Sequence, residues 1–377
     1  MEFIDLKAQY EYIQADVMRR IVDVMKSGHF ILSDEVELFE KKIAEYVGRE
    51  YAVACGNGTE ALQLIYMAYG LGPGDAVFCP DMTFIASIEP AAMLGVHPVF
   101  CDIDLQSYNM DPICLETKIE QVIREGKYIP KAIVAVDFLG HPFDVVRISN
   151  IAKKYGLLLI EDAAQGMGAQ FENRKCGSFG DISATSFFPT KPLGCYGDGG
   201  AVFTDDEEIY KVLRSLRVHG KGKNKYDNIR IGINSRLDSI QAAVLLSKLQ
   251  VFEEEIEKRQ NIAKVYDEAL GRYLKIPSVY VGCKSSYAQY VVLASDIEHR
   301  EQLIQILKEN EIPTIYYYPT PMHQLPVFGY LNASDDDYKN TIQYSNTAFG
   351  IPFSPYLAGE DQHKIIDVMA HALERCE

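Results

Sequence analysis

The stretch YAVACGNGTEALQLIYMAYG, residues 51 to 70, decides the fold. Residues 51 to 55 form a short apolar run that is typical of a buried strand. Glycines and an asparagine follow at 56 to 58, and Thr59 opens a predicted helix that ends at Gly70. The stretch therefore predicts a strand, a tight turn and a helix, in that order.

The same alternation continues along the chain. Apolar runs predict strands at 76 to 80, 98 to 104, 132 to 138, 157 to 163, 183 to 188 and 201 to 205. Periodic segments predict helices at 34 to 47, 87 to 94 and 144 to 155, and one that carries Leu216. Strands that are apolar along their whole length and alternate with helices form a mostly parallel sheet covered on both faces. We therefore expect an α/β domain.

The pattern changes after a long amphipathic helix, which is predicted from Asp238 to Tyr266. Beyond it lie YAQYVVLA (287–294), PTIYYY (313–318) and predicted helices at 299 to 309 and 361 to 374. A chain of 377 residues also exceeds what one core usually fills. We predict a large α/β domain at residues 1–245 and a small C-terminal α+β domain at residues 246–377.

The composition argues against several classes of protein. A formal net charge of -16 disfavours a general nucleic-acid binder, which needs a basic face. The early acids of MEFIDLKAQY disfavour a signal peptide, and no run of about 18 apolar residues predicts a membrane span. The eight cysteines, of which Cys376 is the last, are scattered without metal-ligand spacing. They favour a cytoplasmic protein with reduced thiols.

One basic cluster stands out against this acidic background. Between Lys211 and Arg236 it contains Arg214, Arg217, His219, Lys221, Lys223, Lys225 and Arg230. Such a cluster can hold an anionic ligand, and it can equally be a solvated surface stretch. Asn234 and Arg236, in the polar turn before the long helix, can be helix caps alone.

Several short segments contain residues that suit catalysis or ligand binding. GNGT (56–59) offers backbone N–H groups and a helix dipole to a phosphate, although the same residues are ordinary in loops. Asp162 ends a predicted strand, where a carboxylate points into the ligand-binding crevice; a helix cap or an ion pair is the alternative. By strand alternation, the neighbouring Glu161 points the other way. Phe84 can stack on a flat ring, or it can simply pack in the core.

Lys191 lies between two prolines in SFFPTKPLG (186–194). The rigid backbone holds such a lysine in place, which suits a residue that forms a Schiff base. The alternative is a surface lysine in a turn.

The order and spacing of five segments strengthen the catalytic and ligand-binding roles described above. GNGT, TFIAS, EDAAQ, SFFPTKPLGCYGDGG and RIGINSRLD together resemble the nucleotide-sugar aminotransferases of the DegT and StrS group. The resemblance runs from FIDLKAQY to YYPTPMHQLP. It implies the fold type I of pyridoxal-phosphate enzymes, a pyridoxal 5'-phosphate cofactor, and a nucleotide sugar with glutamate as substrates. It also implies a homodimer with shared active sites.

Within that group, SFFPTKPLGCYGDGGAVFT, RIGINSRLDSIQAAVL and SYAQY resemble enzymes that aminate the 3-keto carbon of UDP-2-acetamido-2-deoxy-hexuronic acid for lipopolysaccharide and O-antigen synthesis. Tyr317 departs from the histidine that such enzymes tend to have there. A neutral 3-keto or 4-keto UDP- or dTDP-sugar is therefore a second candidate acceptor. A sugar dehydratase is disfavoured because Lys191 is present, and a regulatory protein that lost turnover is a further alternative.

The resemblance implies roles for individual residues. Lys191 and Asp162 carry the catalytic roles, as the lysine that binds the cofactor covalently and the carboxylate bonded to its ring nitrogen. The remaining cofactor contacts that it implies are Gly58, Thr59 and Ser186 at the phosphate, Phe84 and Gln165 at the ring, and Asn234 from the neighbouring subunit. The substrate contacts that we expect are His219, Arg230, Tyr317, Tyr318 and His323.

Overall fold

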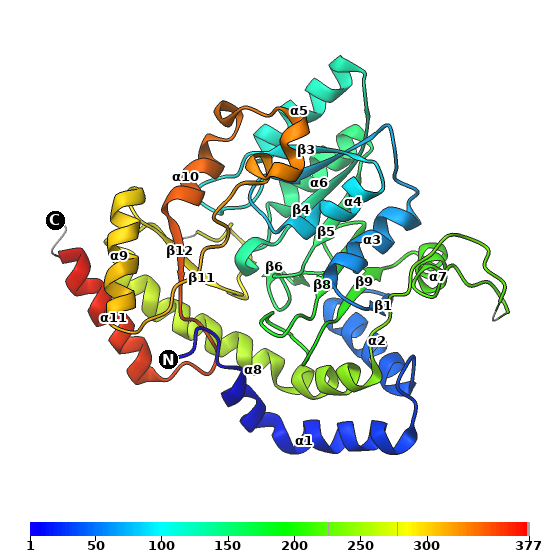
Figure 1. The fold of residues 1–377 in the computed structure, drawn as a ribbon, viewed down its shortest axis with the longest axis horizontal. Coiled ribbons are helices and arrows are strands. Elements are labelled where there is room, and N and C mark those ends of the chain that lie inside the picture. Colours follow the sequence, from blue (N-terminus) through cyan, green and yellow to red (C-terminus); the bar gives the residue numbers. More distant parts are fainter. Residues whose placement is uncertain (225, 277, 375–377) are drawn as a thin grey trace.

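A seven-stranded sheet forms the centre of the computed structural model, which describes residues 1–224, 226–276 and 278–374 (Figure 1). In spatial order the strands are β1 (Tyr51–Cys55), β9 (Gly200–Thr204), β8 (Ile182–Ser186), β5 (Leu158–Asp162), β4 (Ile129–Val136), β2 (Asp75–Pro80) and β3 (His97–Cys101). Only β9 runs antiparallel to its neighbours, while the pairs from β8 to β3 are parallel. The predicted mostly parallel sheet is confirmed.

Helices cover both faces of this sheet because successive strand residues point to opposite sides. Along β4, Ala132 and Val134 join one apolar cluster, whereas Ile133 and Ala135 join another. The first cluster includes residues of α3 (Gly58–Ala68), α4 (Glu89–Met93) and α7 (Glu207–Leu216). The second includes residues of α5 (Pro112–Glu125) and α6 (Val145–Tyr155). A third joins α2 (Asp34–Val47) and β1 to the start of α8 (Ser239–Leu270).

A smaller unit of strands and helices comes after α8 in the chain. The two-stranded sheet of β11 (Tyr290–Leu293) and β12 (Ala348–Ile351) packs with α9 (Ile297–Glu309) and α11 (Gly359–Glu374). Leu245 and Phe252 of α8 belong to a cluster of the large sheet, and Tyr266 belongs to the cluster of the small one. The division of the chain at 245 and 246 stays a prediction.

The chain between β11 and β12 returns to the large sheet. It contains α10 (Lys339–Thr347) and the short 3-10 helices η3 (Met322–Gln324), η4 (Pro326–Leu331) and η5 (Asp335–Asp337). Met322, Phe328 and Tyr344 pack in the same cluster as α3. The C-terminal part of the chain therefore helps to build the edge of the large sheet where its parallel strands end.

Some elements differ from the sequence-based expectations. Helix α3 begins at Gly58, not Thr59, because the Asn57 side chain already caps it by accepting a bond from the Glu60 N–H at 2.8 Å. The helix expected at 87 to 94 is divided into η1 (Ile85–Ser87) and α4. Helices α1 (Leu6–Ser27) and α5 were not expected. The remaining short elements are η2 (Phe138–Gly140), β6 (Gln170–Phe171), β7 (Arg174–Lys175) and β10 (Cys283–Lys284).

Two observations concern the predicted class of protein. Among the described residues, no helix is both long and apolar enough to cross a bilayer. The cysteines at 55, 79, 101, 114, 176, 195 and 283 are free thiols. Cys376, like Lys225 of the basic cluster, lies outside the residues that the structure describes.

Candidate active site

A cavity of about 660 Å³ opens where the parallel strands end. Val136, Asp162 and Ser186 are the last residues of β4, β5 and β8, and all three line it. Its other walls come from the start of α3, from residues 83 to 87 and from Tyr317 and Tyr318. Ligands bind at this edge of open α/β sheets, and the volume suits a small molecule.

The turn before α3 can hold an anion. The backbone N–H groups of Gly58 and Thr59 make no hydrogen bond within the described residues, as is usual in the first turn of a helix. A Cβ atom on Gly58 would lie 2.7 Å from the Cβ of Ser186, so glycine is needed for α3 to approach β8 this closely. The two free N–H groups, the positive end of the helix dipole and the hydroxyl groups of Thr59 and Ser186 together suit a phosphate group.

Asp162 lies at the floor of the cavity and is only 5% exposed. Its Oδ2 accepts a hydrogen bond from the Ser87 hydroxyl at 2.7 Å, and its Oδ1 accepts one from the Ala164 N–H at 3.1 Å. The Ser87 hydroxyl lies 2.8 Å from that of Thr83. Burial raises the pKa of Asp162, while these two bonds and the positive charge of Lys191 oppose the rise. The site therefore provides a buried carboxylate with dedicated support for its ionised form.

Lys191 is half-buried in the cavity wall, and its backbone N–H donates to the Phe188 carbonyl at 2.9 Å. Burial lowers the pKa of its amine, and the charge of Asp162 opposes that shift. An amine with a lowered pKa loses its proton more readily, which makes it a better nucleophile and base.

Aromatic side chains and an amide also line the cavity. Phe84 remains 52% exposed, and its ring meets that of Tyr318 at 5.7 Å and 42°. Gln165 accepts a bond from the Leu139 N–H at 2.6 Å and donates one to the Tyr318 hydroxyl at 3.2 Å. An exposed aromatic ring and a buried carboxylate in the same cavity suit a flat heteroaromatic ligand.

Replacing Ser87 with alanine is expected to raise the pKa of Asp162 further, because a bond that favours the carboxylate is lost. The acidic limb of the pH profile of turnover should move to higher pH by about one pH unit, since the lost hydrogen bond stabilised the ionised form by about 1 to 2 kcal/mol. The pH profile of kcat measures this shift. Thr83→Val, which removes only the neighbouring hydroxyl, should shift it less, and an unchanged profile in Ser87→Ala would contradict this role.

The sequence pattern of the DegT/DnrJ/EryC1/StrS aminotransferase family matches residues 11–370. The chain belongs to this family. A Pseudomonas aeruginosa relative, named UDP-2-acetamido-2-deoxy-3-oxo-D-glucuronate aminotransferase, is 41% identical over 95% of this chain and 96% of its own. A Geobacillus stearothermophilus relative named pleiotropic regulatory protein is 38% identical over 97% of each chain. The dTDP-3-amino-3,6-dideoxy-alpha-D-galactopyranose transaminase of Aneurinibacillus thermoaerophilus is 35% identical over 97% of this chain and 98% of its own.

Solved structures of aminotransferases share the fold. One from Brucella abortus, of the same family, has a TM-score of 0.96 with 46% identity and covers 99% of both chains. S. venezuelae DesV in complex with a ketimine intermediate has a TM-score of 0.94 with 32% identity, covering 100% of this chain and 99% of its own. Bacillus subtilis NtdA with bound PMP has a TM-score of 0.87 with 27% identity, covering 96% and 82%. The expected aminotransferase fold is confirmed.

In this aminotransferase the cavity brings together most of the residues named from the sequence. Those that line it are Gly58, Thr59, Phe84, Asp162, Gln165, Ser186, Lys191, Tyr317 and Tyr318. Glu161 points to the other side of the sheet, as alternation predicts, where it accepts bonds from the N–H groups of Phe179 and Gly180 at 2.6 and 3.1 Å. The roles of the cavity residues stay predictions until tested.

Four of the residues named from the sequence lie outside the cavity. His219, Arg230 and Asn234 belong to the long loop after α7, which extends from the body of the molecule (Figure 1). His323 is buried instead between two carboxylates, with Nδ1 2.6 Å from Asp81 and Nε2 3.0 Å from Asp335. Both ring nitrogens of His323 are engaged, so the expected substrate contact would have to break one of these bonds.

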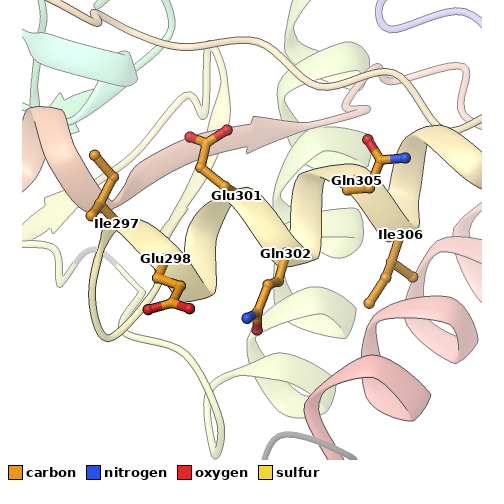
Figure 2. Close-up of a pocket in the computed structure, with 6 residues that line it drawn as sticks. All are labelled: Ile297, Glu298, Glu301, Gln302, Gln305 and Ile306. Carbon is orange, nitrogen blue, oxygen red and sulfur yellow. The ribbon is translucent and has the colours of Figure 1, made fainter.

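Sequence reasoning missed several residues of the cavity. Besides Thr83 and Ser87, these include Glu60, Gln63, Met93, Thr190, Asp198 and Gln289. Thr83 and Ser87 are the first and last residues of TFIAS (83–87). Two hydroxyl side chains four residues apart in this segment could have indicated that both contribute to the site. A separate hollow runs along α9, but its six lining residues all come from that one helix (Figure 2). A catalytic site needs groups that converge from several elements, so we assign no role to it.

Proposed function

We propose that the chain is a pyridoxal 5'-phosphate-dependent aminotransferase that moves an amino group from glutamate to a keto nucleotide sugar. The observation that carries the proposal is the one cavity that Lys191 and Asp162 share with the start of α3. A reactive amine, a buried carboxylate and free backbone N–H groups match the aldehyde, the ring nitrogen and the phosphate of that cofactor.

When bound, the cofactor supplies the electron sink that transamination requires. Asp162, as the carboxylate, would keep a proton on the ring nitrogen. The Lys191 amine would take the proton from Cα of glutamate and pass it to the cofactor carbon that receives the amino group. In the second half-reaction it would take a proton from that carbon and deliver it to the sugar carbon. Phe84, which lines the cavity, would stack on the cofactor ring.

We infer that the acceptor is the 3-keto carbon of a UDP-2-acetamido-2-deoxy-hexuronic acid, in the synthesis of lipopolysaccharide or O-antigen sugars. The name of the 41% identical P. aeruginosa relative supports this acceptor.

A neutral 3-keto or 4-keto UDP- or dTDP-sugar is the second candidate acceptor. Lys191 is the only Lys, Arg or His among the described residues that line the cavity, and Tyr317 is neutral. A sugar carboxylate would therefore need a cation from outside this lining.

A panel of substrates tests the proposal. The purified protein with pyridoxal 5'-phosphate should absorb visible light, lose that band with glutamate, and regain it when the correct keto nucleotide sugar is added. The panel comprises uronic and neutral sugars with 3-keto or 4-keto groups, and mass spectrometry identifies the aminated product. Turnover of neutral sugars alone would contradict the hexuronate acceptor. A protein that stays colourless would instead favour a regulatory role, like that in the name of the G. stearothermophilus relative.

We also propose a homodimer in which the partner subunit's Asn234, Arg230 and His219 complete each site, because these residues do not line the cavity of their own chain. Lys191→Ala and Asn234→Ala proteins should each be impaired. After mixing and subunit exchange, activity should return to about a quarter of the wild-type value, since half of the dimers then contain one intact site. Activity that fails to return, or a fully active monomer, would contradict the shared site.

A further inference from the structure

Gln289 is a buried glutamine in the cavity wall whose amide oxygen has no hydrogen-bond partner among the described residues. It immediately precedes β11, is 6% exposed and lines the same cavity as Lys191. Its side-chain Oε1 is buried without a partner among the described residues. Gln165, another glutamine that lines the cavity, uses both ends of its amide within the protein.

The backbone around Gln289 is held firmly, so local disorder does not explain the unpaired amide. The Ser286 N–H donates to the Gly140 carbonyl at 3.0 Å, and the Ala288 N–H donates to the Leu139 carbonyl at 2.9 Å. Strand β11 then begins at Tyr290 and pairs with β12 along its length. A polar group left unpaired in a rigid, buried position destabilises the protein, and one in the wall of a ligand cavity can be paired by the ligand.

The chemistry of an amide limits what the ligand group can be. Its oxygen needs a donor, and its nitrogen needs an acceptor. A carboxylate or phosphate only accepts hydrogen bonds, so it would leave the amide oxygen unpaired. A hydroxyl group or a secondary amide both donates and accepts, and nucleotide sugars carry both kinds of group.

We propose that Gln289 binds the acceptor sugar through a ring hydroxyl or an acetamido group and thereby selects the sugar over other keto compounds. This inference rests on the proposed function. A site built to pair with a polar substrate group discriminates strongly against ligands that lack it, because its own polar atoms are then left unpaired. Gln289 is therefore a substrate-binding residue of the sugar half-reaction, whereas the carboxylates of glutamate only accept hydrogen bonds and leave its amide oxygen unpaired.

Gln289→Met tests the inference, since methionine keeps the length of the side chain and removes its polar atoms. We expect kcat/KM of the sugar half-reaction to fall about 10- to 100-fold relative to that of the glutamate half-reaction. The thermal unfolding midpoint of the ligand-free protein should stay equal or rise, because no internal bond is lost. Rapid mixing followed at the visible band separates the two half-reactions.

Gln362→Met is the matched control. Gln362 lies on α11, is 8% exposed and donates a hydrogen bond to the Ile262 carbonyl at 2.9 Å. Its replacement should lower the unfolding midpoint, because this bond is lost, but it should not change the ratio of kcat/KM between the two half-reactions. If Gln289→Met lowers the midpoint as Gln362→Met does, or leaves the ratio unchanged, the inference is overturned while the proposed function stands. If the wild-type protein aminates no keto sugar, the proposed function fails instead.

Discussion

Lys191→Ala is expected to abolish transamination and the visible absorption of the cofactor–lysine Schiff base. The substitution removes the amine that holds the cofactor and then moves the proton at Cα, so turnover should fall by about 1,000-fold or more. The pKa of this amine is lowered by burial, which favours its neutral, reactive form. Absorption spectra with pyridoxal 5'-phosphate and steady-state rates with glutamate measure both effects.

A buried lysine outside the cavity provides the control for this result. Burial lowers the pKa of Lys248 to about 8, yet its Nζ lies 4.5 Å above the Tyr196 ring and outside the cavity. Lys248→Met should therefore keep the visible band and the turnover of the wild type. If Lys191→Ala retained both, or if Lys248→Met lost the band, Lys191 would not be the anchoring residue.

The central sheet was predictable because its strands bury both faces. Residues 76 to 80 and 132 to 136 are apolar throughout, and local pattern alone marks such strands. Helix α5 carried comparable signals that were overlooked, namely a capping Asp111 followed by Leu115, Ile119 and Val122 on one face. Helix α1 is harder to predict, because its narrow apolar stripe around Val17 packs against Val244 of α8, far away in the sequence.

The site was predictable only where a residue's local context fixes its position. Asp162 ends a strand and Lys191 lies in a rigid turn, so both could be named before the structure. Ser87 supports Asp162 across 75 residues of sequence, and His323 meets Asp81 across 242. Contacts of this kind arise from the path of the chain in space, which local patterns do not contain. The unpaired amide of Gln289 is likewise visible only when its surroundings are known.

Asp162→Asn is expected to keep the cofactor bound and yet slow the proton transfer from glutamate by about 100- to 1,000-fold. Asparagine preserves the shape of the side chain but carries no charge, so the ring nitrogen loses the partner that keeps it protonated. Burial raises the pKa of Asp162, whereas the hydrogen bonds from Ser87 and Ala164 and the charge of Lys191 lower it. These three contacts stabilise the ionised form of the carboxylate. Single-turnover absorbance with glutamate measures the rate, and cofactor retention after dialysis measures binding.

Glu161→Gln isolates the role of charge at Asp162 from the role of a buried carboxylate in general. Glu161 is the preceding residue of β5 and is fully buried, but it points away from the cavity and accepts bonds from backbone N–H groups. Its replacement should lower the free energy of unfolding, because hydrogen bonds to a charged acceptor weaken, without slowing the transfer step to the same degree. A rate in Asp162→Asn equal to that of the wild type would remove Asp162 from the reaction. A transfer step slowed equally in both variants would show that loss of packing at β5, not charge at the ring nitrogen, limits the rate.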